Sequence, residues 1–259
     1  MTKRTINNRE GHWILARMGK KVLRPGGREL TERLIENLEI STDDRVVEFA
    51  PGLGFTAAIS LKKNPASYTG VELNDEAAGI LRKKIKGSNR NIIIGKAEES
   101  NLEENSYTKV YGEAMLTMQP DKKKSEIIRE AHRILKPGGL YGIHELGLIT
   151  EKVTEDLKLE IQKGLANVIK VNARPLTIEE WTTLMENEGF EIAYTTTNPF
   201  HLLETGRIVK DEGLIRAIKI AFNIFTHKPE RQRILAMKRV FKKYESQMNA
   251  VAIIARKKG

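Results

Sequence analysis

The strongest candidate for a ligand-binding segment lies at residues 46–56, where an apolar run enters a glycine-containing turn and then a helical pattern. Glycine lets a backbone approach a ligand closely, and the amides at the start of a helix can face polar ligand groups. Such a turn predicts a nucleotide-like ligand, although a dinucleotide fingerprint and a plain tight turn share the pattern. The segment contains the acidic Glu48, and its turn holds Ala50, Pro51, Gly52 and Gly54.

Two later segments carry residues suited to a nucleoside. Glu72 lies near the end of an apolar run at residues 68–73, and a carboxylate at the end of a second strand can accept both hydroxyls of a ribose. Leu73 beside it can offer an apolar surface to a purine. After a third run, the amides around Ala97 and the carboxylate of Glu98 can contact an adenine edge. The order of these groups along the chain predicts one shared site.

Short β-type runs alternate with helical patterns through the middle of the chain, and this alternation predicts βαβ units. Helical periodicity is clear at Leu30, Leu34, Ile35 and Leu38, before the first run. We therefore expect an α/β fold with a doubly wound, seven-stranded, mostly parallel sheet, whose ligands bind outside the carboxyl ends of the strands. The expected strands cover residues 45–50, 68–73, 91–95, 109–114, 140–146, 190–197 and 250–255.

Two stretches hold more helix than such a sheet needs, and we interpret them as a cap over the active face. One is an amphipathic helix within residues 150–175, and the other is an insertion at about residues 203–247. Ordinary packing on the outer layer is the alternative. The apolar positions of the insertion are Leu214, Ile215, Ile218, Phe222 and Phe225 in its first helix, and Ile234, Met237, Phe241 and Tyr244 in its second.

The predicted division of the chain follows from these patterns. Residues 1–29 form an N-terminal cap segment, and residues 30–149 form the ligand-binding core. Residues 150–175 hold the inserted cap helix. Residues 176–259 complete the core sheet and contain the helical insertion.

The composition narrows the class of protein. The 259 residues include no cysteine, which excludes disulfides, cysteine-ligated metals and thiol catalysis. The charged N-terminus lacks the apolar centre of a signal peptide, and no apolar run approaches about 20 residues, so we expect a cytoplasmic protein. The formal charge of +10 suits nucleic acid, anionic lipid or an acidic substrate, but scattered lysine pairs favour a solvated basic surface. We expect no metal, because no convincing ligand cluster is visible.

In their order along the chain, these segments resemble the class I S-adenosylmethionine-dependent methyltransferases over roughly residues 30–146. The turn Lys136-Pro137-Gly138-Gly139 before the fifth strand adds to the resemblance. This turn favours a methyltransferase over a dehydrogenase. The distance from the glycine turn to Glu72 does not discriminate, because a dehydrogenase has an acidic residue at a similar distance. The resemblance implies a Rossmann-like methyltransferase fold and S-adenosyl-L-methionine as the cofactor.

The resemblance also implies how the first two strand ends hold the cofactor. Glu48 would orient the loop and the methionine ammonium region, directly or through water. Glu72 would hold the ribose hydroxyls, and Leu73 would pack on the adenine. The family's alternating glycines would line the methionine and ribose, and the first of them is an alanine in this chain. These three positions are Ala50, Gly52 and Gly54.

The third and fourth strand ends depart further from the family. Many relatives have an aspartate just before the alanine of the third motif, whereas this chain has Lys96. We therefore expect Ala97 to contact adenine through its backbone, with Glu98 as the side-chain partner. After the fourth strand, the positions that touch the methionine end in relatives are Glu113, Ala114 and Met115.

Two classes of methyl acceptor fit the motifs. The stretch from Glu48 to Gly54 also resembles the ribosomal RNA adenine dimethyltransferases, but their Asn-Leu/Ile-Pro-Tyr motif has no counterpart at residues 113–118, which lack an aromatic and an amide. The chain is more similar to the small-molecule branch that includes ubiquinone, menaquinone and sterol methyltransferases. We expect a small-molecule acceptor in an enclosed apolar pocket, with nucleic acid disfavoured. A membrane-surface or non-catalytic cofactor-binding protein is a third hypothesis.

A general base is required only where the acceptor must lose a proton. His144 and Glu145 end the fifth strand at the expected active edge, and His201 follows the sixth, so each is a candidate base. A hydrogen-bonded structural role is the alternative for both histidines. His12 lies on the N-terminal segment, which in many relatives folds over the cofactor. The accepting atom stays open among oxygen, nitrogen, carbon and sulfur.

Overall fold

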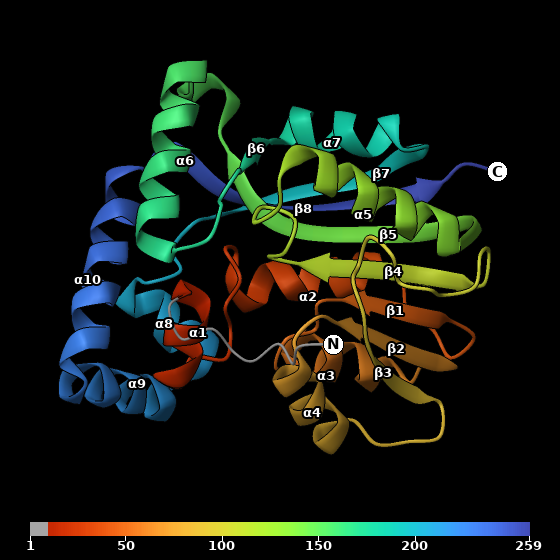
Figure 1. Ribbon diagram of the computed structural model, residues 1–259, viewed down its shortest axis with the longest axis horizontal. Helices are drawn as coiled ribbons and strands as arrows, with labels where there is room; N and C mark the ends of the chain where they lie inside the picture. The colour runs from red at the N-terminus through yellow and green to blue at the C-terminus, as the bar shows by residue number, and fades with distance from the viewer. Residues whose placement is uncertain (1–9) are drawn as a thin grey trace.

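Figure 1 presents the computed structural model, in which residues 10–259 are described. The sheet has the strand order β3-β2-β1-β4-β5-β8-β7, and the two-residue β6 pairs with β5. The expected α/β fold with a seven-stranded, mostly parallel sheet is confirmed, and β6 adds a short eighth strand. The strands are β1 (Arg45–Phe49), β2 (Ser67–Glu72), β3 (Arg90–Ile94), β4 (Tyr107–Glu113), β5 (Leu135–Leu148), β6 (Leu176–Thr177), β7 (Phe190–Pro199) and β8 (Met248–Lys257).

The strand order reverses between β1 and β4. From β1 the sheet extends through β2 to β3, and the chain then crosses back to place β4 on the other side of β1, with all these pairs parallel. Phe49 at the end of β1 is in register with Gly112 near the end of β4. Ligands of open α/β sheets bind at such a switch point. Only β8 runs against its neighbours, antiparallel to both β5 and β7 among the described strands.

Two helical layers cover the sheet, as expected for strands buried on both faces. α5 and α7 pack on one face, and α2, α3 and α4 on the other (Figure 1). Phe49 faces the first layer, while Val46 faces the second, because successive side chains of a strand alternate. The helices are α1 (Gly11–Arg17), α2 (Gly27–Asn37), α3 (Phe55–Ser60), α4 (Asp75–Lys84), α5 (Asp121–Ile134), α6 (Glu155–Ile169), α7 (Ile178–Asn187), α8 (Thr205–Glu212), α9 (Leu214–Thr226) and α10 (Lys228–Lys243).

The start of β5 differs from the expectation of a turn followed by a strand. Leu135 already pairs with Tyr107, and the ladder resumes at Leu140, which pairs with Lys109. The four residues between them bulge out of the sheet, with Gly138 at a φ of +77° that favours glycine. The Lys-Pro-Gly-Gly segment is therefore a bulge inside a longer strand.

The helices outside the two layers gather at one end of the sheet, on the left of Figure 1. α1, α6 and α10 share an apolar cluster that includes Leu15, Leu165 and Met237. The predicted cap is wrong in one respect, because the apolar face of α9 is not turned inward. Ile215 of α9 is 87% exposed and Phe225 is 72% exposed, so this face meets solvent.

Candidate active site

A cavity of about 700 Å³ opens at the carboxyl ends of β1 to β4 and continues beneath α1, α6 and α10. Its lining includes Glu72 after β2, Glu98 after β3, and Glu113 at the end of β4. The structure thus brings together residues that are 26 and 15 positions apart along the chain.

The loop after β1 has the shape needed for close backbone approach. Ala50 and Gly52 line the cavity in left-handed conformations, with φ of +52° and +58°. An alanine in this region costs on the order of 1 kcal/mol, so the tertiary fold imposes the conformation on Ala50. A Cβ atom added at Gly52 would meet nothing within 4 Å. Pro51 between them also lines the cavity.

Gly54 has a different position from the one that the resemblance implied. It precedes the first residue of α3 as its N-cap, and it does not line the cavity. A Cβ atom there would lie 2.7 Å from Cδ2 of Leu81, which packs beneath the loop. Gly54 therefore allows the turn to pack closely against Leu81 of α4, on the side away from the cavity.

Glu72 is buried at the cavity wall and is fixed by two backbone amides. Its Oε2 accepts the N–H of Gly52 at 2.8 Å, and its Oε1 accepts the N–H of Asn74 at 2.9 Å. Burial raises the pKa of Glu72, and these amides oppose that rise. Each oxygen retains a lone pair, so the carboxylate can still accept hydrogen bonds from a ligand. Leu73 beside it is 42% exposed and lines the same wall.

The segment after β3 contributes the far end of this wall. Ala97 and Glu98 both line the cavity, as does Lys96. Oε1 of Glu98 lies 2.8 Å from Nζ of Lys123 on α5. Glu98 is thus held in an ion pair while it borders the cavity.

Glu113 is the centre of a buried hydrogen-bonded group at the end of β4. It accepts from Nε of Arg24 at 2.6 Å and from Oγ1 of Thr31 at 2.7 Å, and it also contacts Thr56 and His144. Burial alone would raise the pKa of Glu113. The Arg24 guanidinium and the hydrogen bond from His144 overcome this effect and hold the pKa well below its usual range.

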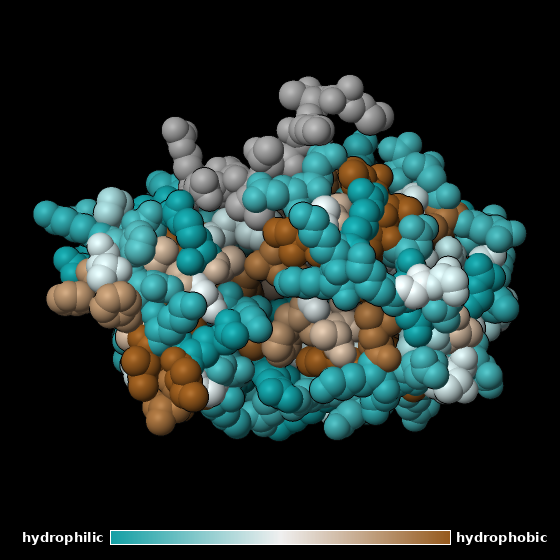
Figure 2. Space-filling view, turned by 90° about the horizontal axis from the view of Figure 1, so that it is seen from below, coloured by the Kyte–Doolittle hydropathy of each residue, from teal (hydrophilic) through white to brown (hydrophobic). Residues whose placement is uncertain are grey.

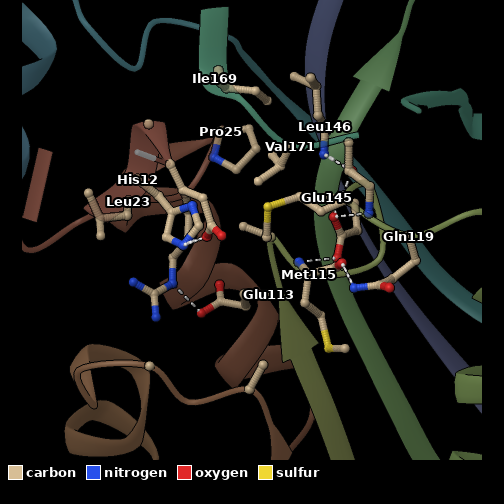
Figure 3. A pocket seen from close by; sticks show the side chains of 18 of the residues that line it. His12, Leu23, Pro25, Glu113, Met115, Gln119, Glu145, Leu146, Ile169 and Val171 are labelled. Atoms are coloured by element: carbon tan, nitrogen blue, oxygen red, sulfur yellow. Dashed lines mark hydrogen bonds and ion pairs between the residues drawn. The ribbon is translucent and has the colours of Figure 1, made fainter. Parts of the chain in front are cut away.

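Ala114 and Met115 follow Glu113 and line the cavity (Figure 3). Ala114 has a φ of +52°, the second alanine of the site in the left-handed region. Non-glycine residues in such conformations tend to occur at functional sites, because the surrounding structure must impose them.

His144 contradicts the expectation of a general base, because both of its ring nitrogens are engaged. Nε2 accepts the Gly26 N–H at 3.0 Å, and Nδ1 lies 2.7 Å from Oε1 of Glu113. The ring is fully buried and does not line the cavity. The proton must sit on Nδ1, since Nε2 is an acceptor. His144 therefore acts as a neutral positioning residue in this geometry.

Glu145 borders the cavity, but its carboxylate is saturated by the loop after β4. It accepts the N–H groups of Met115, Leu116 and Thr117 and the hydroxyl of Thr117, at 2.7–3.0 Å. Figure 3 shows Glu145 beside Met115, with dashed lines at its carboxylate. The expectation of a base is contradicted here also, because the carboxylate holds a loop in place.

His201 lies outside the cavity, in the segment that follows β7. Its Nδ1 is 3.1 Å from Oε1 of Glu245, and the side chain is 36% exposed. The expectation of a base at this position is wrong, because no part of His201 faces the cavity lining. His201, Glu204 and Glu245 form a group of possible metal-ligating side chains. Nζ of Lys242 already forms ion pairs with both carboxylates of this group.

Glu48 is buried behind the loop that it was expected to orient. Its Oε2 accepts from the hydroxyls of Tyr68 at 2.6 Å and Tyr111 at 2.8 Å. Burial raises the pKa of Glu48 to about 7, although both tyrosines oppose the rise. Glu48 does not line the cavity, so contact with the methionine region is not supported by this geometry.

The N-terminal segment supplies cavity residues that the sequence motifs did not identify. His12, Leu23 and Pro25 line the cavity opposite Met115 (Figure 3). Burial lowers the pKa of His12 to about 4, so its imidazole is neutral at pH 7. Nothing in the spacing of this segment's residues indicated contact with β4.

The part of the cavity beneath the cap is largely apolar. Leu146 of β5, Ile169 at the end of α6 and Val171 beyond it face this region (Figure 3). Phe200, Met237 and Phe241 complete the wall from the segment after β7 and from α10. The cavity thus joins a polar region at the strand ends to an apolar chamber under the cap.

Comparison with known proteins identifies relatives over most of the chain. Residues 46–139 match the family described as "Methyltransferase domain". An uncharacterized protein of Haemophilus influenzae is 32% identical over 251 residues, which cover 95% of this chain and 98% of that protein. Sterol 24-C-methyltransferase erg-4 of Neurospora crassa is 26% identical over 174 residues, covering 62% of this chain and 43% of the sterol enzyme.

Among solved structures, the cyclase SpnF superposes with a TM-score of 0.74 at 16% identity, covering 99% of both chains. At this identity the likeness concerns the fold alone. No helix in the described part of the chain is long and apolar enough to cross a membrane.

Proposed function

The chain belongs to the class I S-adenosylmethionine-dependent methyltransferases and uses S-adenosyl-L-methionine, and from this premise we propose that it methylates an apolar small molecule held beneath its helical cap. The observation that carries the proposal is the apolar chamber that continues the cavity away from the strand ends. Ligand pockets of this kind combine apolar walls with a few polar groups that orient the ligand.

The polar end of the cavity fits the cofactor. We propose that Glu72 holds the ribose hydroxyls, since its two oxygens are fixed by amides yet retain lone pairs. Gly52 leaves open space where a side chain would stand, which suits close passage of a ligand. Leu73 and Ala97 border the same end and suit the adenine, with Glu98 beside them.

The methyl group must pass from cofactor to acceptor where the polar end of the cavity meets the apolar chamber under the cap. S-adenosylmethionine supplies an electrophilic methyl group, and the chain's task is to hold the accepting atom in line with it. We propose that Met115 and Pro25 narrow the cavity at this junction, because they border it from opposite sides. The Arg24–Glu113 ion pair holds Pro25 in this position.

We propose that His12 is the base for an acceptor that must lose a proton. It lines the cavity from α1, and burial lowers its pKa to about 4, so the imidazole is neutral at pH 7 but is a weaker base than a solvated histidine. Its Nε2 lies 3.4 Å from Oε2 of Glu10, which can stabilise the imidazolium that would form. His144, by contrast, is sealed away from the cavity by Gly26 and Glu113.

The relatives are named for small-molecule acceptors of both kinds, apolar sterols and polar phosphoethanolamine. The Neurospora protein is named a sterol methyltransferase, and it aligns with 62% of this chain. The chain spans less than half of that enzyme's length, so the sterol itself is not carried over.

The test is a methyl-transfer screen with S-adenosylmethionine labelled in its methyl group. The protein is incubated with a cell extract that has been separated into organic-soluble, water-soluble, RNA and protein fractions. We expect label in an organic-soluble product, absent with the Glu72→Gln variant. Label confined to the RNA or protein fraction, or to a polar water-soluble product, would contradict the proposal.

A further inference from the structure

One face of α9 is apolar and turned to solvent. Leu214, Ile215, Ile218, Phe222 and Phe225 recur at helical spacing and are 62–87% exposed. Figure 2 shows hydrophobic side chains gathered at the lower left edge, the side on which α9 lies in Figure 1. Contiguous apolar patches on soluble proteins mark surfaces that contact another molecule or a membrane.

The same part of the chain carries most of the protein's net positive charge. Residues 205–243, which span α8 to α10, contain eleven Lys and Arg against three Asp and Glu, while the whole chain has a formal charge of +10. Lys219 and Lys228 are exposed beside the apolar face. The guanidinium of Arg231 lies 5.5 Å from the ring centroid of Phe225, so charge and apolar surface are directly adjacent.

We propose that this surface docks on an anionic lipid bilayer, with the apolar face of α9 at the boundary between headgroups and acyl chains. An apolar helical face flanked by Lys and Arg is the pattern of helices that lie in this interface, because apolar burial and attraction to anionic lipid add together. Long basic side chains can reach the headgroups while their stems cover apolar surface.

The concentration of charge decides against a second copy of the chain as the occupant. Two copies joined through α9 would place two strongly basic surfaces against each other, and like charges across an interface oppose association. An anionic bilayer supplies the opposite charge over the whole surface, so the charge becomes favourable.

The docking surface is tied to the loop that lines the cavity. Nδ2 of Asn223 on α9 donates to the carbonyl of Met18 at 2.9 Å. Glu212 at the end of α8 accepts the backbone N–H groups of Lys21 and Val22 at 2.7 and 2.8 Å. That loop continues into Leu23 and Pro25 of the cavity wall. The bilayer contact therefore lies next to the cavity, which suits an acceptor drawn from lipid.

The test measures binding of the purified full chain to vesicles and needs no methyl transfer, so its result is independent of the proposed function. Vesicles of phosphatidylcholine with about one third phosphatidylglycerol are compared with vesicles of phosphatidylcholine alone by flotation. We expect binding to the anionic vesicles at least about tenfold stronger, and weakened by high salt because screening shortens the electrostatic reach. Absence of binding to the anionic vesicles overturns the proposal.

Variants distinguish binding through α9 from non-specific hydrophobic adsorption to vesicles. Phe222→Ser with Phe225→Ser is expected to weaken binding at least about tenfold, because two exposed aromatic side chains no longer insert. Leu159→Ser on α6 is the matched control, since Leu159 is 52% exposed, and it should bind within about twofold of the native chain. Circular dichroism melts check that each variant is folded. Unchanged binding by the double variant overturns the proposal.

The charge contribution has its own matched pair. Lys219→Glu with Lys228→Glu is expected to weaken binding by about fivefold or more per site. Lys62→Glu with Lys63→Glu makes the same charge change in the exposed residues after α3 and should have a much smaller effect. Equal losses from both pairs would show a diffuse charge effect and overturn the assignment to α9. Light scattering that shows a dimer lost in the Phe222 and Phe225 double variant would identify a second copy as the occupant instead.

Discussion

Nδ1 of His144 lies 2.7 Å from Oε1 of Glu113, and Nε2 of the same ring accepts the Gly26 N–H at 3.0 Å. One buried imidazole within β5 therefore joins the end of β4 to the loop that carries Arg24 and Pro25. Arg24 returns to Glu113 with an Nε to Oε2 distance of 2.6 Å. These contacts fasten the N-terminal segment over the strand ends, so the cavity wall depends on groups that never face the cavity.

His144→Gln should lower the free energy of unfolding without changing the pH dependence of kcat. The variant disrupts buried hydrogen bonds to Gly26 and Glu113, at a cost of about 2 kcal/mol in the free energy of unfolding. The pH dependence of kcat should keep its shape, because His144 is not the base. Urea unfolding and a pH–rate profile measure the two effects, and His201→Gln serves as the exposed control. Loss of one limb of the profile with stability unchanged would restore His144 as a base.

Arg24→Ala should destabilise the fold at neutral pH and weaken the dependence of its stability on acid pH. Removal of the guanidinium leaves the carboxylate of Glu113 short of its main compensating charge, at a cost of about 2 kcal/mol or more. The folded-state pKa of Glu113 lies below its ordinary value. Its contribution to stability is therefore present above an ordinary carboxyl pKa of about 4.3 and is lost as the pH falls through the lowered folded value.

In the Arg24→Ala variant this acid-dependent loss should be smaller, because the folded-state pKa of Glu113 rises and its difference from the unfolded value shrinks. Unfolding free energies at neutral and mildly acidic pH measure it. Arg28→Ala is the control, since Arg28 forms an exposed ion pair with Glu32 that contributes less than about 1 kcal/mol. Equal unfolding free energies of the Arg24→Ala and Arg28→Ala variants at both pH values would contradict the role assigned to Arg24.

Glu48→Gln should change how stability varies between pH 5 and pH 8. Burial raises the folded-state pKa of Glu48 to about 7, above its unfolded value. The stability that the protonated form contributes is thus complete below the unfolded pKa and is lost as the pH rises through about 7. The loss is on the order of 3 kcal/mol. The amide cannot ionise, so the variant should lose less stability over this range in chemical unfolding. A native-like slope in Glu48→Gln would show that Glu48 is ionised throughout.

His12→Gln tests the proposed base. With an acceptor that loses a proton, kcat should fall by about 100-fold, while KM changes little. Because the pKa of His12 is lowered to about 4, the native rate should not vary through ionisation of this residue near neutral pH. Steady-state kinetics measure both constants, and His227→Gln on the exposed helix start is the control. An unaltered kcat in His12→Gln would contradict the assignment of His12 as the base.

The fold and the position of Glu72 at a strand end were predictable because their signals are local. Glu72 falls at the end of a β-type run, and such a run with the helix after it predicts a strand end at the sheet edge. The left-handed turn after β1 was visible in its glycines, although the capping position of Gly54 was not. The tertiary context also imposes a left-handed conformation on Ala50, which its residue type does not favour.

The remaining site residues were not predictable, for two physical reasons. Arg24 and Glu113 are 89 positions apart, and sequence spacing carries no information on such pairs. His144 and Glu145 lie in a strand buried on both faces, so no alternation of polar and apolar residues reveals which side chain meets the cavity. The prediction that the apolar face of α9 points inward was wrong for a related reason. An amphipathic pattern does not say what covers the apolar side of a helix.

Calorimetry with S-adenosylhomocysteine, comparing the native chain with Glu72→Gln, tests the central claim most directly. We predict one site per chain in the native protein and affinity at least about tenfold weaker in Glu72→Gln, because the amide cannot accept both ribose hydroxyls. Glu48→Gln is the internal control and should bind within about twofold of the native chain, since Glu48 lies behind the loop. Equal affinity of the native chain and Glu72→Gln would contradict the placement of the cofactor at the end of β2.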